Sequence, residues 1–346
     1  MKCLKPITAY KIGKHRNDKG QLKDTVVFSF KEAVKHVPVT RIQKCEILIP
    51  CGKCEACLKN KRLEQSLRIT HEIEQYEDNC FITLTYNNEN LPFTDGKNII
   101  RGVSDVTEDL HPTLNIEDYQ KWLKRFRKKI QAETKQKIRY FIVGEYGSKG
   151  QRPHYHAIIF GWKPKDLKEH KFHGKYWTYR SEFIESTWKL GFSEVGVDVN
   201  AGVAKYCAQY VTKKFVKHER PEYVLDEFVR ASKMNGGIGS QFIHLFHKQV
   251  SEQGYILSLN RKTGQAYKSS IPKYYLAILE KFYKDDFDKL QSNKEVFLEN
   301  AKKDNEAKKE EDWIKHFNEV EQKVMYYHEM QKRQVRSYED DRPFLN

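Results

Sequence analysis

The sequence predicts an α+β protein in which an antiparallel sheet is flanked by helices. Runs rich in β-branched and aromatic residues, typical of strands, occupy residues 81–88, 138–147 and 152–162. Apolar positions at helical spacing occur at 116–133, and a further helix is expected at 202–216. The connection GSKGQRP contains two glycines and a proline, which favours a hairpin between the second and third strands. These three observations favour antiparallel pairing over a parallel α/β sheet.

The segments before and between these strands have weaker signals. Residues 1–60 contain short apolar pieces among turn residues, and we expect irregular structure there. Residues 58–76 have apolar positions at helical spacing without proline or glycine, which predicts a helix. Residues 87–112 are loop-like, and a short helix is expected around 180–190.

The helix expected at 116–133 is strongly amphipathic. Asn115 precedes it and is a residue type favoured at helix N-caps. One face is rich in Lys and Arg, which is typical of a solvated face and also suits contact with phosphates. The other face holds the apolar residues that we expect to be buried, namely Tyr119, Trp122, Leu123, Phe126 and Ile130.

Composition divides the chain into three regions. A cysteine-rich segment packed on the core is expected over residues 1–75, and a core domain over 76–280. From about residue 280 the chain is mostly Lys, Glu, Asp and Asn, with apolar residues still at helical spacing. We therefore expect a charged helical extension over 281–346.

Charge and hydropathy narrow the class of partner. The 346 residues contain 62 Lys+Arg against 47 Asp+Glu, a formal charge of +15, and the mean hydropathy is -0.78. Such an excess of positive charge favours a polyanion, most often nucleic acid. No apolar run approaches the roughly 18 residues of a membrane span, and the amino terminus lacks an apolar signal segment. A cytoplasmic protein without a membrane partner is expected.

The seven cysteines are an odd number, and three of them fall in CGKCEAC. Without a signal peptide, metal ligation is expected before a disulfide framework. Cys51, Cys54 and Cys57 can supply three thiolates to a tetrahedral Zn²⁺ that needs a fourth ligand. The candidates for that ligand are Cys3, Cys45 and His71; unligated thiols remain the alternative.

The segment RPHYHAIIFG places two histidines one residue apart at the start of a strand. On a strand His154 and His156 face the same side, and the predicted hairpin brings Glu145 toward them. Two imidazoles, a carboxylate and open positions suit a catalytic divalent cation that binds a phosphate oxygen. Surface histidines without a ligand are the alternative.

The segment AKYCAQYVTKK carries a second candidate group. Tyr206 and Tyr210 are four residues apart and share one helical face, and Lys213 lies one turn further. A phenol attacks a phosphodiester poorly because its pKa is about 10, but a cation on the phosphate and a nearby lysine lower that barrier. Ordinary packing is the alternative role for the two tyrosines.

The order FITLTY, RPHYHAIIFG and YCAQYVTKK resembles the three motifs of rolling-circle replication initiators of the His-hydrophobic-His endonuclease superfamily. The tyrosine pair is similar to that of its two-tyrosine branch. Further segments resemble the replication initiators of gokushovirus-type microviruses, over roughly residues 1–280. These segments are MKCLKP, IPCGKCEACLKNKRLEQSLRITHE, the GGIG loop and IPKYY.

The resemblance implies a fold and a site. It implies a five-stranded antiparallel sheet with the histidines on a central strand and the tyrosines on a helix packed across it. His154, His156 and Glu145 would bind Mg²⁺ or Mn²⁺, and Tyr206 and Tyr210 would be paired nucleophiles. Lys213 would be an accessory base or charge stabiliser. Because MKCLKP is among the family-like segments, Cys3 is the first candidate for the fourth zinc ligand.

The function expected is therefore nicking and rejoining of single-stranded origin DNA in rolling-circle replication of a small phage. The product would be a 5′-phosphotyrosine and a free 3′ hydroxyl. The site of action would be the cytoplasm of an infected bacterium. No GxxxxGK[ST] motif is present, so a host helicase and polymerase are expected partners. The alternatives are a non-catalytic zinc-containing nucleic-acid-binding protein, or a plasmid relaxase or transposase.

Overall fold

The structure is a computed structural model of the 346-residue chain. It describes residues 3–294 apart from 17, 19, 21, 103–108, 148–149, 175, 214–219, 235 and 260–265. Most of the extension expected over 281–346 therefore lies outside the described residues. Residues 284–294, at its start, are helical.

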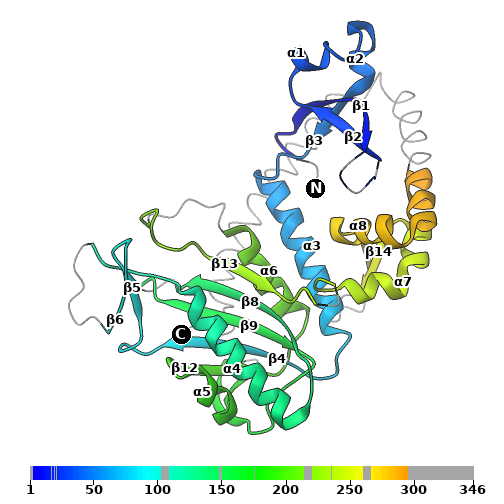
Figure 1. The fold of residues 1–346 in the computed structure, drawn as a ribbon. Helices are drawn as coiled ribbons and strands as arrows, with labels where there is room; N and C mark the ends of the chain where they lie inside the picture. Colours follow the sequence, from blue (N-terminus) through cyan, green and yellow to red (C-terminus); the bar gives the residue numbers. More distant parts are fainter. Residues whose placement is uncertain are drawn as a thin grey trace.

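A seven-stranded antiparallel sheet forms the centre of the molecule (Figure 1). The hairpin expected from GSKGQRP is confirmed, because β8 and β9 pair antiparallel with Glu145 opposite His154. In sheet order the strands are β10 (Lys168–Phe172), β11 (Trp177–Arg180), β12 (Gly191–Gly196), β4 (Asn79–Tyr86), β9 (Pro153–Phe160), β8 (Arg139–Tyr146) and β13 (Phe228–Ala231).

The strand number differs from the five that the resemblance implies. The five strands from β12 to β13 form a continuous sheet, and the hairpin of β10 and β11 lengthens it at the β12 edge. β11 pairs with β12 only at Tyr179 and Val195. β10 has the sequence KEHKF and is almost fully exposed, so it lacks the apolar alternation by which strands are recognised.

Both faces of the sheet are covered, which explains why β9 is buried at every residue. On one face, Ile82, Leu84 and Tyr155 pack against α4 (Ile116–Thr134) and α5 (Glu182–Trp188). On the other face, Phe81 and Ile158 pack against α3 (Glu55–Ile73) and α6 (Ala201–Lys213). Period-two alternation assigns neighbouring residues of each central strand to opposite cores.

The helix expected at 116–133 is confirmed as α4. The Asn115 side chain caps it by accepting a hydrogen bond from the Glu117 backbone amide. All five residues of the expected apolar face are buried against the sheet. Since the apolar face is covered, the face rich in Lys and Arg points to solvent.

The first 60 residues are more regular than expected. A three-stranded sheet contains β1 (Ile7–Arg16), β2 (Leu22–Val27) and β3 (Glu46–Ile49), and the short helices α1 (Phe30–Ala33) and α2 (Val39–Cys45) lie between β2 and β3. Its core is small, with Tyr10, Ala33 and Ile42 as the buried apolar residues. So few buried positions leave a weak pattern in the sequence. α3 leads from this small sheet to the central one (Figure 1).

Residues 87–112 also differ from the loop that was expected. β5 (Pro92–Thr94) pairs with β6 (Ile99–Arg101) and β7 (His111–Pro112) in a second small sheet. Short strands of two or three residues are too brief to give a periodic signal.

The remaining helices pack beside α3. α7 (Ser240–Gln253) and α8 (Lys273–Phe282) share a core around Ile243 and Tyr275, and β14 (Ile256–Leu259) pairs with β15 (Ala266–Ser269) between them. Among the described residues, no helix has the length and apolar character needed to cross a membrane.

The GGIG loop is fixed between α3 and α8. The Glu72 carboxylate accepts a hydrogen bond from the Gly239 amide at 2.6 Å, and the Tyr274 hydroxyl accepts one from the Gly237 amide at 2.6 Å. Gly239 has a φ of 76°, and a Cβ there would lie 2.5 Å from the Tyr275 hydroxyl oxygen. The loop therefore requires glycine for both its conformation and its close packing.

Candidate active site and four-cysteine cluster

The two histidines and the glutamate meet on the α6 face of the sheet. Nε2 of His154 and Nε2 of His156 each lie 2.6 Å from Oε1 of Glu145. All three side chains are buried, and His156 is completely so. The antiparallel register of β8 and β9 produces this convergence, as expected from the sequence.

This group has the donor atoms of a divalent cation site. One atom from each side chain lies within 4.8 Å of the other two. Ligands at about 2.1 Å from an octahedral Mg²⁺ lie about 3 Å from one another, so the Glu145 carboxylate would need to move only slightly to admit an ion. Two nitrogens and one oxygen also leave positions open for phosphate oxygens or water.

The charge state of Glu145 suits a cation ligand. Burial raises the pKa of its carboxyl, but the charges of the two histidines and their hydrogen bonds outweigh burial and hold the pKa well below its usual value. The carboxylate is therefore ionised at neutral pH, as a metal ligand must be.

Thr83 holds His156 from the other side of the ring. It lies directly opposite His156 in the pairing of β4 with β9, and its hydroxyl oxygen is 3.0 Å from Nδ1. With Nδ1 engaged, Nε2 is directed at Glu145. The sequence placed Thr83 in FITLTY without assigning it to the site; its position opposite His156 is the signal that could have identified it.

The two tyrosines of α6 reach the same group. The Tyr206 hydroxyl donates to Oε1 of Glu145 at 3.3 Å and lies 3.1 Å from Nε2 of His156. The Tyr210 hydroxyl donates to the Tyr206 oxygen at 2.7 Å. A chain of contacts therefore runs from Tyr210 through Tyr206 to the candidate cation ligands.

Burial and the nearby Glu145 charge raise the pKa of both tyrosines well above the usual value. Both phenols are thus protonated in the described arrangement. Lys213, the third residue expected in this group, is the last residue of α6, and its side chain lies outside the described part of the chain.

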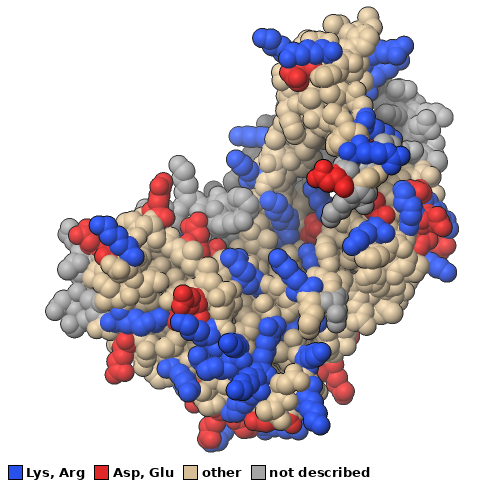
Figure 2. All heavy atoms as spheres, in the orientation of Figure 1, with Lys and Arg blue, Asp and Glu red and all other residues tan. Residues whose placement is uncertain are grey.

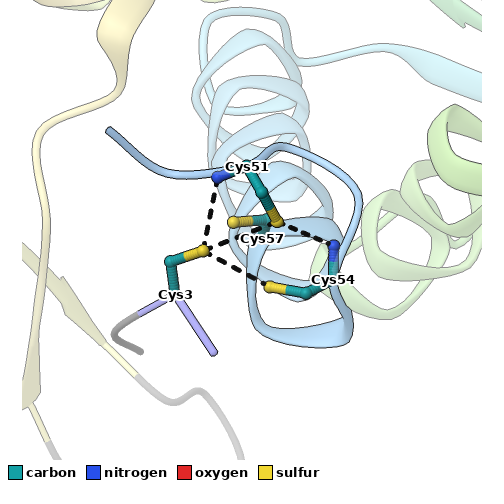
Figure 3. Close-up of side chains that lie close together, drawn as sticks. All are labelled: Cys3, Cys51, Cys54 and Cys57. Carbon is teal, nitrogen blue, oxygen red and sulfur yellow. Dashed lines mark hydrogen bonds between the residues drawn. The ribbon is translucent and has the colours of Figure 1, made fainter. Parts of the chain in front are cut away.

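The four cysteines that the sequence singled out also meet. Cys51 and Cys54 lie in the turn before α3, Cys57 lies in its first turn, and Cys3 faces them from the N-terminal segment (Figure 3). The two other candidates for a fourth ligand are elsewhere: Cys45 ends α2, and His71 is bonded to Tyr275 through Nδ1 at 2.9 Å.

The spacing of the sulfur atoms fits a tetrahedral ion. Sγ of Cys3 lies 3.5 Å from Sγ of Cys51 and 3.7 Å from Sγ of Cys54. Four thiolates at about 2.3 Å from a zinc ion lie about 3.8 Å apart, whereas a disulfide would bring two sulfurs to about 2.05 Å. All seven cysteines are free thiols, so the cluster has the geometry of a metal site.

Backbone amides stabilise thiolates in this cluster. The Cys54 amide donates to the Cys51 sulfur and the Cys51 amide donates to the Cys3 sulfur. Hydrogen bonds from the Cys57 and Leu4 amides lower the pKa of Cys54 to about 6, whereas burial raises the pKa of Cys57 to about 12. Cys54 is therefore the most readily ionised of this pair. The two further cysteines, Cys80 and Cys207, are fully buried core residues, as expected.

Comparison with known proteins identifies the class. A family model described as replication-associated protein ORF2 matches residues 79–215, from the start of β4 to just beyond α6. This segment contains both histidines, Glu145 and the tyrosine pair. It defines the chain as a replication-associated protein.

Three phage proteins are similar over most of the chain. The chain is 30% identical over 285 residues to the replication-associated protein VP4 of Bdellovibrio phage phiMH2K, covering 80% of this chain and 76% of that protein. It is 29% identical over 273 residues to the replication-associated protein ORF4 of Chlamydia phage 1, with coverages of 75% and 62%. It is 27% identical over 290 residues to the replication-associated protein ORF2 of Spiroplasma virus 4, with coverages of 83% and 83%.

The chain belongs to this family of phage replication-associated proteins, which confirms the resemblance to microvirus replication initiators. No solved structure matches it.

Proposed function

We propose that the chain is a nicking endonuclease and strand transferase that cuts single-stranded origin DNA through a tyrosine and later rejoins it. The observation that carries this proposal is the contact of Tyr206 with both Glu145 and His156. A phosphodiester that bound at the open side of the cation ligands would be placed beside a phenol. Proximity of this kind supplies much of the rate in phosphoryl transfer.

The proposed reaction balances without water. The phenolic oxygen attacks phosphorus, the bond from phosphorus to the 3′ oxygen breaks, and the 3′ oxygen leaves with a proton as a free hydroxyl. The phenol proton passes to a base, for which Lys213 is our candidate. A bound Mg²⁺ or Mn²⁺ would withdraw electron density from the phosphate oxygens. The reverse attack by a 3′ hydroxyl on the phosphotyrosine regenerates the phenol and closes the strand.

The tyrosine pair supports two successive cuts. Since the hydroxyls of Tyr206 and Tyr210 lie 2.7 Å apart, either one can approach a phosphate held at the same place. One tyrosine would hold the 5′ end of the first strand while the other cuts the regenerated origin. Adjacent nucleophiles of equal chemistry suit such an alternation.

The second site is proposed as structural Zn²⁺. Four thiols without an open position leave no place for a substrate, which is typical of structural zinc. The cysteines join the amino terminus to the start of α3, so an ion there would hold residues near Cys3 against the central domain. The proposed setting is the cytoplasm of an infected bacterium, with a host helicase and polymerase as partners.

The decisive experiment is a covalent-adduct assay. A radiolabelled origin oligonucleotide is incubated with the chain and Mg²⁺ or Mn²⁺, and label is followed onto the protein. We expect Tyr206→Phe/Tyr210→Phe to remove the adduct, while Tyr179→Phe on β11 retains it. An undiminished adduct in the double variant would show that the nucleophile is another residue.

Two other functions explain fewer observations. A non-catalytic zinc-containing DNA-binding protein accounts for the charge and the cysteines, but leaves the convergence of Tyr206 on Glu145 and His156 without a purpose. A relaxase or transposase shares the chemistry. Relaxases of this superfamily commonly carry the tyrosine near the amino terminus, and many of its transposases carry one tyrosine. The pair on α6 therefore favours replication.

A further inference from the structure

The solvent face of α4 carries an uninterrupted row of cations. Lys121, Lys124 and Lys128 follow one another at intervals of three and four residues, so they lie on one side of the helix, and all three are exposed. Lys121 has an ion pair with Glu117 at 2.7 Å. Within the described part of the chain, Lys124 and Lys128 have no acidic partner. Figure 2 shows Lys and Arg side chains gathered over α4.

A cavity lies beyond the carboxyl-terminal half of this row. Its volume is about 400 Å³, and it lies between the end of α4, the start of β8 and the segment after β13. Arg127, Lys137 and Lys233 contribute three cations to its lining, and none of the three has an acidic partner among the described residues. Tyr140 also lines it, with the Arg127 guanidinium 4.8 Å from the centre of its ring.

This surface is separate from the candidate active site. Tyr140 and Glu145 lie five residues apart on β8, which corresponds to about 16 Å along the strand, and an odd separation directs them to opposite faces. Tyr140 packs with the core under α4, whereas Glu145 faces α6. A ligand of the α4 surface cannot therefore be the phosphate that Tyr206 attacks.

We propose that the α4 surface is a second binding site for single-stranded DNA. The row of lysines would follow the phosphates of the strand, and the cavity would hold one unpaired nucleotide between its cations and the Tyr140–Arg127 stack. Cations spaced along a helix suit a backbone of repeated negative charge. An aromatic ring with a stacked guanidinium suits an unstacked base, which a duplex does not present.

The inference depends on the proposed function only in the choice of DNA as the polyanion. A strand held at this second site would lie on the opposite side of the sheet from the tyrosines. A replication protein that cuts one segment of a strand could thereby keep another segment of it bound.

Binding is measured on the full chain carrying Tyr206→Phe/Tyr210→Phe, so that no adduct forms whatever the nucleophile. Fluorescence anisotropy with a labelled 30-nucleotide single strand gives Kd over a series of salt concentrations without added divalent cation. We expect Lys121→Gln/Lys124→Gln/Lys128→Gln to raise Kd roughly tenfold and to lower the slope of log Kd against log salt by about 2. Arg127→Gln should raise Kd further for the single strand.

The matched control is Lys31→Gln/Lys44→Gln/Lys281→Gln, which removes the same charge from exposed positions outside α4. If this control weakens binding as much as the α4 triple variant, the α4 site is excluded. A duplex of equal length distinguishes the nucleotide cavity from phosphate contacts. Arg127→Gln should affect the single strand more than the duplex, and an equal effect on both would overturn the cavity assignment.

A direct test places 5-iodouracil in the single strand and maps the photo-crosslink by mass spectrometry. We expect a crosslink at Tyr140 or its neighbours in the cavity. Crosslinks confined to α6 would overturn the proposal. Thermal unfolding of each variant shows that the chain remains folded, and adduct formation by the α4 variants with Tyr206 and Tyr210 intact tests the catalytic proposal separately.

Discussion

The two candidate metal sites of this chain differ in how they are built. Glu145, His154 and His156 are held by two paired strands, and their ligand atoms leave room for a substrate oxygen. The four cysteines come from one turn and a segment some fifty residues away in sequence, and they surround the ion position completely. An open site of nitrogen and oxygen ligands suits catalysis, whereas a closed site of thiolates suits structure.

The contrast also concerns what each site supports. The histidine site has two potential nucleophiles within hydrogen-bond distance, and strands of the central sheet hold its ligands in place. The cysteine cluster belongs to a region with a small core, where a metal ion would supply stability that apolar burial does not. Removing ligands from the two sites should therefore have different consequences.

The largest effect is expected at the cysteine cluster. Cys54→Ser should abolish zinc retention and make residues 1–54 sensitive to protease, because structural zinc sites contribute about 10–16 kcal/mol to metal-coupled folding. Cys45→Ser, outside the cluster, should retain one zinc per chain by mass spectrometry of the native protein. Equal zinc content in both variants would exclude the cluster as the zinc site.

The next effect concerns the histidine site. His154→Ala/His156→Ala should reduce adduct formation by at least about 100-fold, because both nitrogen ligands of the catalytic cation are lost. Zinc content should not change. His170→Ala on β10 is the control and should nick at the normal rate. A double variant that lost zinc while it continued to nick would reverse the roles assigned to the two sites.

A smaller effect is expected from the residue that positions His156. Thr83→Val removes the hydroxyl beside Nδ1 and should weaken Mn²⁺ binding about 10–100-fold, as measured by calorimetry. Thr85→Val is the matched control, because Thr85 lies on the same face of β4 but its hydroxyl donates to the Phe192 carbonyl at 3.4 Å. Similar Mn²⁺ affinities in the two variants would show that Thr83 does not position the ligand.

The smallest effect concerns the histidine that is not a zinc ligand. Burial lowers the pKa of His71 to about 4 from 6.5. Between these values the unfolded chain binds more protons than the folded chain, so stability should fall as the pH drops from about 6.5 to about 4.

The free energy lost at His71 over this range should be on the order of 2 kcal/mol. Denaturant unfolding should show that His71→Gln removes this part of the pH dependence, whereas exposed His36→Gln does not. His71→Gln should also retain zinc. If zinc were lost, His71 would have to join the cluster.

Much of the candidate site could be predicted from the sequence because its spacing is local. A period of two places His154 and His156 on one face, and a hairpin loop of known composition brings Glu145 opposite them. A period of 3.6 places Tyr206 and Tyr210 on one face of α6. The structure then placed all five side chains in contact.

Weakly patterned regions could not be predicted in this way. The residues of β10 are polar and exposed, and those of β1 alternate little, so neither strand differs in composition from a loop. The sheet therefore has seven strands in place of five, and the amino-terminal region forms a sheet of its own. Pairing with a neighbouring strand, which sequence does not display, stabilises these segments.

The sequence by itself determined which faces of individual strands and helices carry chemistry, because backbone geometry repeats over two or 3.6 residues. Only the tertiary structure decided which of those faces meet. It placed Thr83 against His156, chose Cys3 over Cys45 and His71 for the cysteine cluster, and directed the cations of α4 away from the tyrosines. The physical reason is that such contacts depend on strand pairing and core packing between distant segments, for which local periodicity contains no signal.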